Sequence, residues 1–417
     1  MRSHCGLAKE LVLGAAVVCG LAACSGGGMS DPISSSNSLS GGNSSGGSSS
    51  SSSSGGGTAA GAFAVTNLVS DGAAGFPAAH QDMTHLVNPW GIAFEPNGVV
   101  WTANNGTQTS TLYDGTGTAQ GLVVNLLNTS NGQFDPTGVV YNGSADFIVS
   151  QGAASGAAEF IYDGEGGALA GWSFSTGSTA VTVYDDGAGK AVYKGLAIAN
   201  TAGGNRLYAA DFHNNKIDVF DRAFNKIAVS GGFKDATLPA GYAPFNIQAL
   251  GGMLYVTYAE QMAPANHDEV DGAGLGLVDV YDYEGNLQQH LVPVGGALNA
   301  PWGLALAPAG FGSVGGDLLV GNFGDGRINV YNPSSGSFVG MLAGTNGNPV
   351  AIPGLWGISF ANGGNTLFFA AGINDEADGL YGRIDVSAVA SGGSSSSSGG
   401  GGSSSSSGGG SSGGYMY

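Results

Sequence analysis

The stretch "NAPWGLALAP" at residues 299–308 decides the fold, because variants of it recur along the chain. "NPWGIAF" stands at 88–94 and "GLWGISF" at 354–360. Looser copies of the same phrase lie between these, at 136–141 (PTGVVY), 193–198 (YKGLAI) and 244–249 (PFNIQA). A phrase that returns at similar intervals within one chain indicates a repeat architecture.

Each repeat unit contains four short apolar runs. After the opening phrase comes a second run, such as "FIVSQGA" (147–153) or "LLVGNFG" (318–324), and then a run that ends in an aromatic-Asp turn, such as "FIYDG" (160–164). Apolar alternation, β-branched and aromatic residues and Asp/Asn/Gly turns are typical of strands. Four antiparallel strands per repeat form the blade of a β-propeller. We therefore predict an all-β fold, a six-bladed β-propeller with four antiparallel strands per blade.

The two ends of the repeat region predict how the ring closes. The last unit ends at "GRIDVS" (382–387) and lacks a fourth strand, whereas "AFAVTNLVS" (62–70) precedes the first opening phrase. An N-terminal strand that completes the last blade would leave no open sheet edge. We expect this strand to close the last blade.

The opening phrase suits the entry into an innermost strand. Proline restricts the backbone there, and glycine lets the chain approach its neighbours near the axis. Trp90, Trp302 and Trp356 have two interpretations: they pack between blades or line the channel mouth, or they form a stacking platform for a ligand.

The composition narrows the function classes. The chain carries 30 acidic and 11 basic residues, with a formal net charge of −19. A surface that binds nucleic acid needs clustered Lys and Arg, so we expect no nucleic-acid partner. Two Ser/Gly-rich tracts cannot bury apolar area. The expected organisation is a signal peptide at 1–23, a flexible tether at 24–57, the propeller at 58–388 and a Ser/Gly-rich disordered tail at 389–417.

The N-terminus predicts export and lipid anchoring. Arg2 and Lys9 precede an apolar run that ends in small residues, which is typical of a signal peptide. The closing "LAAC" resembles the bacterial lipobox, in which cleavage before the cysteine is followed by its lipidation. On this interpretation Cys24 anchors the protein to a membrane, and Ser25 after it favours the outer membrane. The alternative is ordinary cleavage near Ala23 beside a chance cysteine.

Two stretches resemble a known repeat. "LYAADFHNNKIDVFD" (207–221) and "LLVGNFGDGRINVYN" (318–332) are similar to the NHL repeat. The lipobox, tether and "NPWGIA" opening together resemble a family of uncharacterised bacterial secreted propellers. The resemblance implies the fold and export, and it says little about function, because propellers carry unrelated activities.

In a propeller, the loops that enter the inner strands and those that follow the second strands open on one face. Polar loops that converge on a rigid scaffold are the natural binding surface. Asn and Asp are also ordinary turn residues, so each has a structural interpretation too. The expected ligand-binding face comprises Trp90, Asn104, Asn105, Gln151, Asp211, His213, Asn214, Phe245, Trp302, Asn322, Asp325, Trp356 and Asn374.

Three sets of residues are candidate metal ligands. Propeller lactonases and lyases hold a central ion through side chains from different blades, and Glu260, Asn322 and Asn374 could converge in that way. "HQDMTH" offers His80, Asp82 and His85, a donor set suited to a transition metal. The acidic loops "HDEVD" (267–271) and "NDEAD" (374–378) could hold Ca²⁺ through carboxylates, or they are simply solvated.

These observations favour a binding role over catalysis. The sequence contains no motif for nucleophilic catalysis. We predict a monomeric, lipid-anchored propeller that acts as a binding module or scaffold for a protein or glycan in the bacterial envelope. The alternative is a metal-dependent propeller enzyme, lactonase- or lyase-like, with its ion at the central channel.

Overall fold

The computed structural model describes residues 59–96, 98–361 and 363–387. The signal peptide, the tether with Cys24 and the C-terminal tail lie outside the described residues. Helical structure in the described part is limited to four single 3-10 turns: η1 (Asn105–Thr107), η2 (Phe174–Thr176), η3 (Gly187–Gly189) and η4 (Gly312–Val314). None of its helices is long and apolar enough to cross a membrane.

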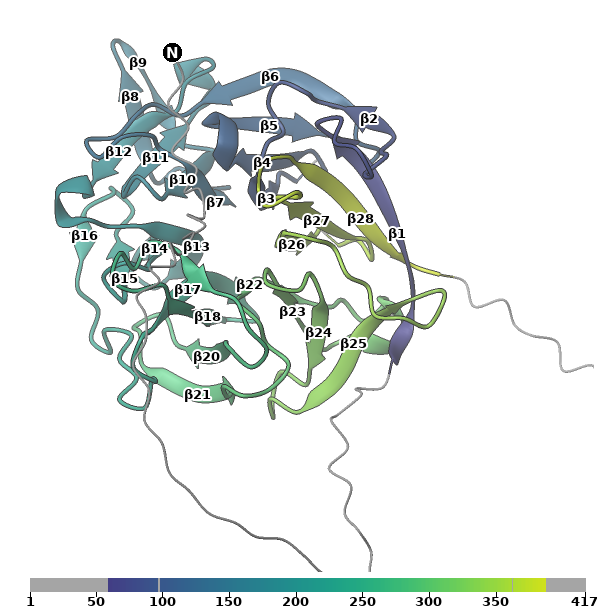
Figure 1. Cartoon of the computed structure of the whole chain (residues 1–417). Helices are drawn as coiled ribbons and strands as arrows, with labels where there is room; N and C mark the ends of the chain where they lie inside the picture. The colour runs from purple at the N-terminus through teal and green to yellow at the C-terminus, as the bar shows by residue number, and fades with distance from the viewer. Residues whose placement is uncertain (1–58, 97, 362, 388–417) are drawn as a thin grey trace, which may run out of the picture. The chain divides into compact units, whose positions relative to one another are not determined.

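The strands pair into six antiparallel sets of four, here called blades 1–6 (Figure 1). Blade 1 consists of β3 (Pro89–Phe94), β4 (Val100–Asn104), β5 (Thr109–Tyr113) and β6 (Ala119–Asn125). Blade 2 consists of β7 (Pro136–Tyr141), β10 (Phe160–Gly164), β11 (Ala168–Trp172) and β12 (Val181–Asp185). Blade 3 consists of β13 (Tyr193–Thr201), β14 (Gly204–Asp211), β15 (Lys216–Phe220) and β16 (Lys226–Ile227). Blade 4 consists of β17 (Tyr242–Leu250), β18 (Met253–Gln261), β20 (Leu277–Tyr281) and β21 (Leu287–Val292). Blade 5 consists of β22 (Pro301–Leu306), β23 (Leu318–Asn322), β24 (Ile328–Tyr331) and β25 (Phe338–Gly344). Blade 6 consists of β26 (Leu355–Phe360), β27 (Leu367–Ala371), β28 (Leu380–Val386) and β1 (Ala59–Ser70). The predicted all-β propeller fold is confirmed.

The four remaining strands are short: two extend blades, and two form a hairpin of their own. They are β2 (His80–Gln81), β8 (Ile148–Gln151), β9 (Ala154–Ala157) and β19 (Glu269–Val270). The strand β2 pairs with β1, β19 pairs with β18, and β8 pairs with β9.

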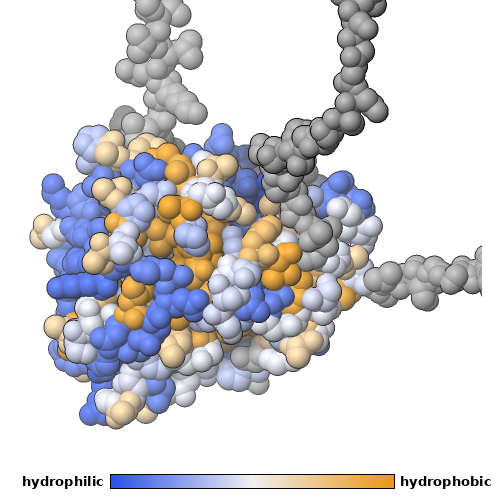
Figure 2. Space-filling view, turned by 90° about the horizontal axis from the view of Figure 1, so that it is seen from below, coloured by the Kyte–Doolittle hydropathy of each residue, from blue (hydrophilic) through white to orange (hydrophobic). Residues whose placement is uncertain are grey.

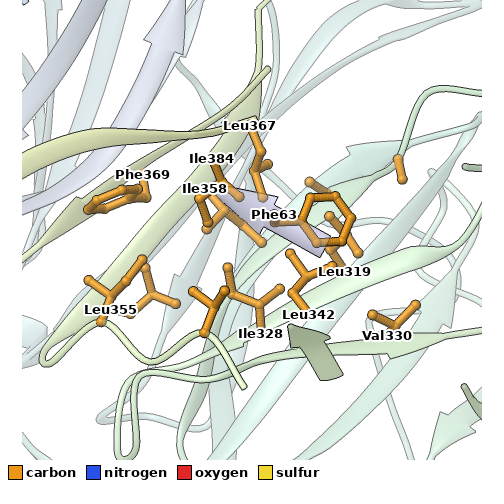
Figure 3. Close-up of a cluster of buried hydrophobic side chains, with 14 of the residues drawn as sticks. Phe63, Leu319, Ile328, Val330, Leu342, Leu355, Ile358, Leu367, Phe369 and Ile384 are labelled. Carbon is orange, nitrogen blue, oxygen red and sulfur yellow. The ribbon is translucent and has the colours of Figure 1, made fainter. Parts of the chain in front are cut away.

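The N-terminal strand closes the ring as predicted. β1 pairs antiparallel with β28, from Phe63 opposite Val386 to Ser70 opposite Leu380, and its first residues also pair in parallel with β25. Phe63 is 1% exposed, and its ring lies 4.8 Å from that of Phe311. Figure 3 shows Phe63 among the buried aliphatic side chains of blades 5 and 6. The first strand of the chain therefore completes blade 6 and seals its contact with blade 5.

The glycine of the opening phrase brings each inner strand against the next. A Cβ on Gly91 of β3 would lie 2.6 Å from the carbonyl oxygen of Thr137 in β7, and one on Gly357 of β26 would lie 2.5 Å from that of Trp90. Any larger residue would push the two backbones apart. β17 has Asn246 at this place, and its Nδ2 donates to the Trp302 carbonyl at 2.7 Å. The recurring phrase thus marks the place where neighbouring inner strands pack closely against each other.

Blade 2 departs from the expected strand assignment. The stretch "FIVSQGA" is not its second strand, because β7 pairs directly with β10, the "FIYDG" stretch. β8 and β9 form a separate hairpin at the outer edge of the ring (Figure 1). The loop that follows the second strand of blade 2 therefore begins at Glu165 and does not contain Gln151.

The outer strands form the rim of the ring. β25 exposes Phe338 and Val339, 39% and 40% accessible. The space-filling view from below shows hydrophobic residues interspersed with hydrophilic ones (Figure 2). Scattered apolar side chains of this kind are normal on protein surfaces.

Candidate functional site

Aromatic side chains close the central channel. Trp356 stacks on Trp90 at 3.5 Å between ring centroids and on Phe323 at 3.9 Å, while Trp302 meets both tryptophans edge-on. The tryptophans are at most 4% exposed. Two of the indole nitrogens serve the scaffold, since Trp302 donates to the Lys194 carbonyl and Trp356 donates to Asn88, whereas that of Trp90 is buried without a hydrogen-bond partner among the described residues. The packing interpretation of the tryptophans therefore describes this structure better than an open stacking platform.

A cavity of about 270 Å³ lies at the mouth of the channel, beside Trp90. We call it the mouth cavity. Every blade contributes to its wall, through the starts of inner strands and the loops after second strands. Its lining residues are Trp90, Glu165, Lys194, His267, Asp268, Glu269, Phe323, Asp375 and Glu376.

Lys194 is the central charge of the mouth cavity. Its side chain is 2% exposed, and Nζ lies 2.6 Å from Oε1 of Glu165 and 3.8 Å from Oε2 of Glu269. The ammonium also stands 5.1 Å from the ring centroid of Trp90, a cation–π distance. Burial alone would lower the pKa of Lys194, but the charges of Glu165 and Glu269 outweigh burial and raise it. Lys194 therefore stays protonated.

Glu165 is held as a carboxylate. Burial would raise its pKa, but the charges of Lys194 and His267 lower it. A 2.9 Å hydrogen bond that Asn105 Nδ2 donates to Oε2 lowers the pKa further. The net effect is a pKa below the ordinary glutamate value. Asn105, predicted as a ligand residue, thus orients a cavity residue.

The carboxyl groups of Glu269 and Glu376 are under-compensated. Burial raises the pKa of Glu269 to about 7 despite Lys194. Burial, followed by the charges of Glu269 and Glu165, raises the pKa of Glu376 to about 8. Asp268 accepts a 2.7 Å hydrogen bond from His267, which raises the pKa of that imidazole. The mouth cavity thus holds five carboxyl groups against Lys194 and His267.

The "NDEAD" loop delivers Glu376 through a strained turn. Asn374, Asp375 and Glu376 have φ angles of 56°, 53° and 65°, three successive non-glycine residues in the left-handed region. Each such residue costs about 1–2 kcal/mol relative to the right-handed form. The Glu376 amide donates to the Gly372 carbonyl at 3.3 Å and the Ala377 amide to Asn374 at 3.2 Å. Strain of this kind concentrates at functional sites.

A second cavity of about 560 Å³ adjoins the first, and we call it the side cavity. Phe323 and Asp375 line both. Its wall comes from blades 4–6 and from the segment after β1, and it is rich in glycine. Its lining residues are Phe76, Asp271, Phe323, Gly324, Asp325, Gly326, Pro353, Gly354, Gly372, Asn374 and Asp375.

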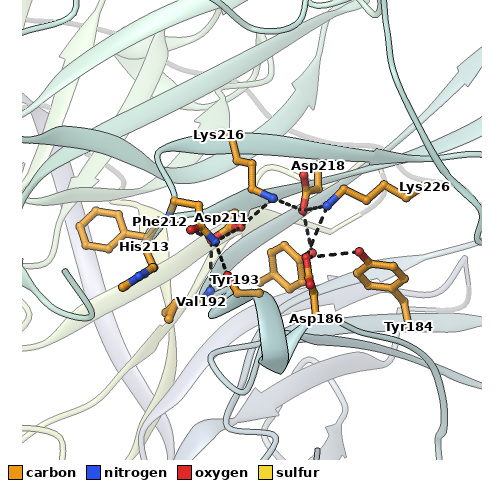
Figure 4. A network of polar contacts seen from close by, with 12 residues as sticks. Tyr184, Asp186, Val192, Tyr193, Asp211, Phe212, His213, Lys216, Asp218 and Lys226 are labelled. Atoms are coloured by element: carbon orange, nitrogen blue, oxygen red, sulfur yellow. Dashed lines mark hydrogen bonds and ion pairs between the residues drawn. The ribbon is translucent and has the colours of Figure 1, made fainter. Parts of the chain in front are cut away.

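Several predicted ligand residues are used by the scaffold. Asn104 and Phe245 are 0% exposed, the first bonded to threonines of blade 1 and the second packed in the aromatic plug. Asp211 is 0% exposed and accepts from the Val192 amide and from Asn214 (Figure 4). Figure 4 also shows how Asp211 belongs to a lysine–aspartate network that joins blades 2 and 3.

The other predicted ligand residues scatter over different environments. His213 is partly buried, and its Nδ1 lies 3.0 Å from the Ala265 carbonyl. Gln151 is exposed on the rim hairpin, away from the channel mouth. Asp325 and Asn374 line the side cavity, as noted above.

The predicted metal set of Glu260, Asn322 and Asn374 divides among three environments. Glu260, the last residue but one of β18, pairs with Tyr242 and Val270. Asn322 is 0% exposed and donates to the Ala297 carbonyl and Asp325, and Asn374 donates to Asp378.

The "HQDMTH" loop does not form a three-ligand cluster. Asp82 accepts from Tyr113 and from the backbone of His85, and His80 stays apart in the short strand β2. Two other groups of the described residues bring three metal-type donors within 4.8 Å: Glu165, His267 and Asp268, and Asp235, Asp279 and His290. The two acidic loops, by contrast, meet at the mouth cavity through Glu269 and Glu376.

Sequence reasoning missed Glu165 and Lys194. One signal was present: the opening phrase carries lysine in "YKG", where the other copies carry Trp, Thr, or Phe before the Gly or Asn. A lysine at a position that points into a ring of inner strands needs a buried counter-charge. The partner could not be identified, because the strand assignment of blade 2 placed Gln151 where Glu165 stands.

Fold and cavity together define a β-propeller with an ionisable cavity at the mouth of a closed channel. The chain belongs to the family of two uncharacterized proteins of Acanthamoeba polyphaga mimivirus, R648 and L690. It is 34% identical to R648 over 315 residues, covering 74% of this chain and 76% of that protein. It is 33% identical to L690 over 315 residues, covering 74% of this chain and 82% of that protein. No protein-family model matches the chain.

Solved structures share the fold at low identity. A protein of unknown function from Bacteroides thetaiotaomicron has a TM-score of 0.50 and 12% identity, covering 78% of this chain and 76% of that one. Virginiamycin B lyase from Staphylococcus aureus has a TM-score of 0.48 and 11% identity, covering 78% of this chain and all of that one. Likeness at this level concerns the fold and transfers no activity.

Proposed function

We propose that the protein is a binding module whose recognition site is the mouth cavity together with the side cavity. The observation that carries this proposal is that all six blades bring side chains to one rigid cavity in which carboxyl groups outnumber cations. Concave sites with an apolar wall and a few placed polar groups are the usual form of ligand sites. The partner we propose is a protein or glycan.

We also propose that the module works outside the cytoplasm, anchored through a lipid on Cys24. This part rests on the N-terminal sequence alone. The family relatives named above are encoded by a virus, so they do not bear on a bacterial envelope.

A metal-dependent enzyme is less well supported by the same residues. Glu165, His267 and Asp268 offer three donor atoms within 4.8 Å. However, the Lys194 ammonium already contacts Oε1 of Glu165 at 2.6 Å, so this carboxylate oxygen is engaged in an ion pair and is not a free metal ligand. The excess of carboxyl groups over cations in the mouth cavity instead suits a preformed binding site for a chemical group of a partner molecule.

The test is a binding screen with paired variants of the full chain. Glycan and peptide arrays are probed with the wild type, with Phe323→Ala at the junction of the two cavities, and with Phe338→Ala on the rim as the matched control. We expect array hits that Phe323→Ala loses and Phe338→Ala keeps. Hits that survive Phe323→Ala would place recognition elsewhere and refute the proposed site. Metal analysis of the same preparations tests the enzyme alternative, which requires a stoichiometric ion that Glu165→Gln removes.

A further inference from the structure

We propose that the mouth cavity binds the lysine or arginine side chain of an extended peptide segment, whose neighbouring residues lie in the side cavity. This inference rests on the proposed binding function and names its ligand. It concerns the chemistry of the two cavities and not the origin of the partner.

The first argument is unmatched charge. Lys194 satisfies Glu165 at 2.6 Å, but its distance to Glu269 of 3.8 Å exceeds that of a hydrogen bond. The Glu269 side chain is 8% exposed, and no side chain among the described residues hydrogen-bonds its carboxyl group. Its own backbone amide is the donor that remains, and a buried carboxylate with so few hydrogen-bond donors is costly. An incoming ammonium or guanidinium supplies those donors.

The second argument is the direction from which the acids converge. Glu269 comes from the loop after β18 in blade 4, and Glu376 comes from the left-handed turn after β27 in blade 6. Lys194 and Glu165 line the same cavity from blades 3 and 2. A cationic group that enters from the face would meet carboxyl oxygens from both acidic loops. Neither a neutral glycan nor an acidic peptide would match that arrangement.

The third argument is the aromatic wall. Lys194 already places its ammonium 5.1 Å from the Trp90 ring centroid, so the cavity accommodates a cation beside an indole. Phe323 is only partly buried and lines both cavities. The methylene stem of a lysine or arginine packs on such rings while its charged end reaches polar groups. A hydrated metal ion gains nothing from these rings.

The side cavity explains why the ligand is a peptide and not a free amine. It is about twice the volume of the mouth cavity and shares Phe323 and Asp375 with it. Gly326 and Gly354 form part of its wall and pack directly on neighbouring backbone, since a Cβ on either would collide with the carbonyl of Ile352 or Gly372. The volume of the side cavity leaves room for the peptide backbone on one side of the anchored side chain. Asp271 and Asp325 keep the side cavity acidic.

The experiment measures binding of short probes to the full-length protein by fluorescence anisotropy. The probes are labelled Ala-Ala-Lys-Ala-Ala and its arginine, norleucine and glutamate versions, with n-butylamine, Ca²⁺ and neutral oligosaccharides as unlabelled competitors. We expect the lysine and arginine peptides to bind at least tenfold more tightly than the norleucine peptide. Glu269→Gln and Glu376→Gln, from different loops, should each weaken the lysine peptide at least tenfold. Glu284→Gln, at an exposed pair with Arg206, is the matched control.

The outcomes separate this inference from the proposed function. If n-butylamine displaces the labelled peptide at the same molar concentration as the unlabelled peptide does, the assignment of a peptide ligand is wrong. If Ca²⁺ or an oligosaccharide binds in a way that Phe323→Ala abolishes, while basic peptides do not bind, the ligand is wrong and the binding site stands. If no probe binding depends on Phe323, Glu269 or Glu376, both proposals fail. The two glutamine variants guard against misfolding, because thermal melting identifies either one that loses the fold.

Discussion

Replacing Lys194 by methionine should destabilise the protein by about 3–5 kcal/mol at pH 8, the usual cost of breaking a buried ion pair from one side. Methionine keeps the length and apolar stem of the side chain, so the loss reports the charge. Lys194 is 2% exposed and Glu165 is 11% exposed, so water can do little to replace the ammonium. Asn105 remains as a donor to Glu165, which places the expected loss toward the lower end of the range.

The loss should shrink at low pH. In the wild type, Lys194 helps to hold the pKa of Glu165 below its ordinary value, so the pair contributes stability above that value and loses it as pH falls. In the variant, burial raises the pKa of Glu165, and a buried carboxyl group with a raised pKa becomes more destabilising as pH rises. The wild-type contribution is already complete at pH 5, above the ordinary pKa of glutamate, so the raised pKa of Glu165 in the variant is what widens the gap between wild type and variant from pH 5 to pH 8.

Urea denaturation followed by tryptophan fluorescence at pH 5 and pH 8 measures this gap. Lys234→Met, at an exposed lysine, is the matched control and should change stability by less than about 0.5 kcal/mol. Adding Glu165→Gln to Lys194→Met removes the stranded carboxylate and should recover part of the loss at pH 8, a non-additive result expected of contacting residues. A loss under about 1 kcal/mol at pH 8, an equal loss at both pH values, or simple additivity of the two changes would refute the reasoning.

Three further predictions concern the closure, the acidic turn and the N-terminus. Phe63→Ala should lower the free energy of unfolding, measured by urea denaturation, by about 3–5 kcal/mol, as expected for a buried phenylalanine. The rim variant Phe338→Ala should change it by no more than about 1 kcal/mol. Similar losses in both variants would contradict the closure argument. Because the pKa of Glu376 is raised to about 8, its burial should cost stability as pH rises from 5 to 9, and Glu376→Gln should flatten the fall of Tm over that interval; parallel curves would speak against it. In a bacterial host, Cys24→Ser should abolish labelling with palmitate, and persistent labelling would disprove lipidation at this cysteine.

The fold could be predicted because its signals are local and repeated. The opening phrase marks each inner strand, and its glycine is needed wherever two inner strands touch, as Gly91 and Gly357 show. The closing strand could be predicted because a missing strand at one end matched a spare strand at the other. Blade 2 could not be assigned correctly, since the β8–β9 hairpin carries the same apolar alternation as a blade strand. Pattern alone does not say which of two strands pairs with the inner one.

The face of the site could be predicted, but its key charges could not. Loop position follows from propeller topology, and it brought Asn105, Asp325 and Asn374 to the two cavities or their supporting shell. Whether a polar residue faces a cavity or the scaffold depends on side-chain direction. Asp211 shows the limit: it lies at the end of a second strand but turns inward to Val192 and Lys216.

The closure and the candidate site are mechanically linked through the "NDEAD" loop. The amide of Asp71, just after β1, donates to the Gly379 carbonyl at 3.2 Å, and the amide of Asn88 donates to the Asp378 carbonyl at 3.3 Å. The N-terminal segment therefore holds both the last blade and the turn that presents Glu376. Because that turn contains three strained residues, releasing its anchors favours relaxation of the turn and removes an acid from the mouth cavity. Weakening the closure should thus reduce ligand affinity before the ring unfolds, and a bound ligand should in turn stabilise the closure.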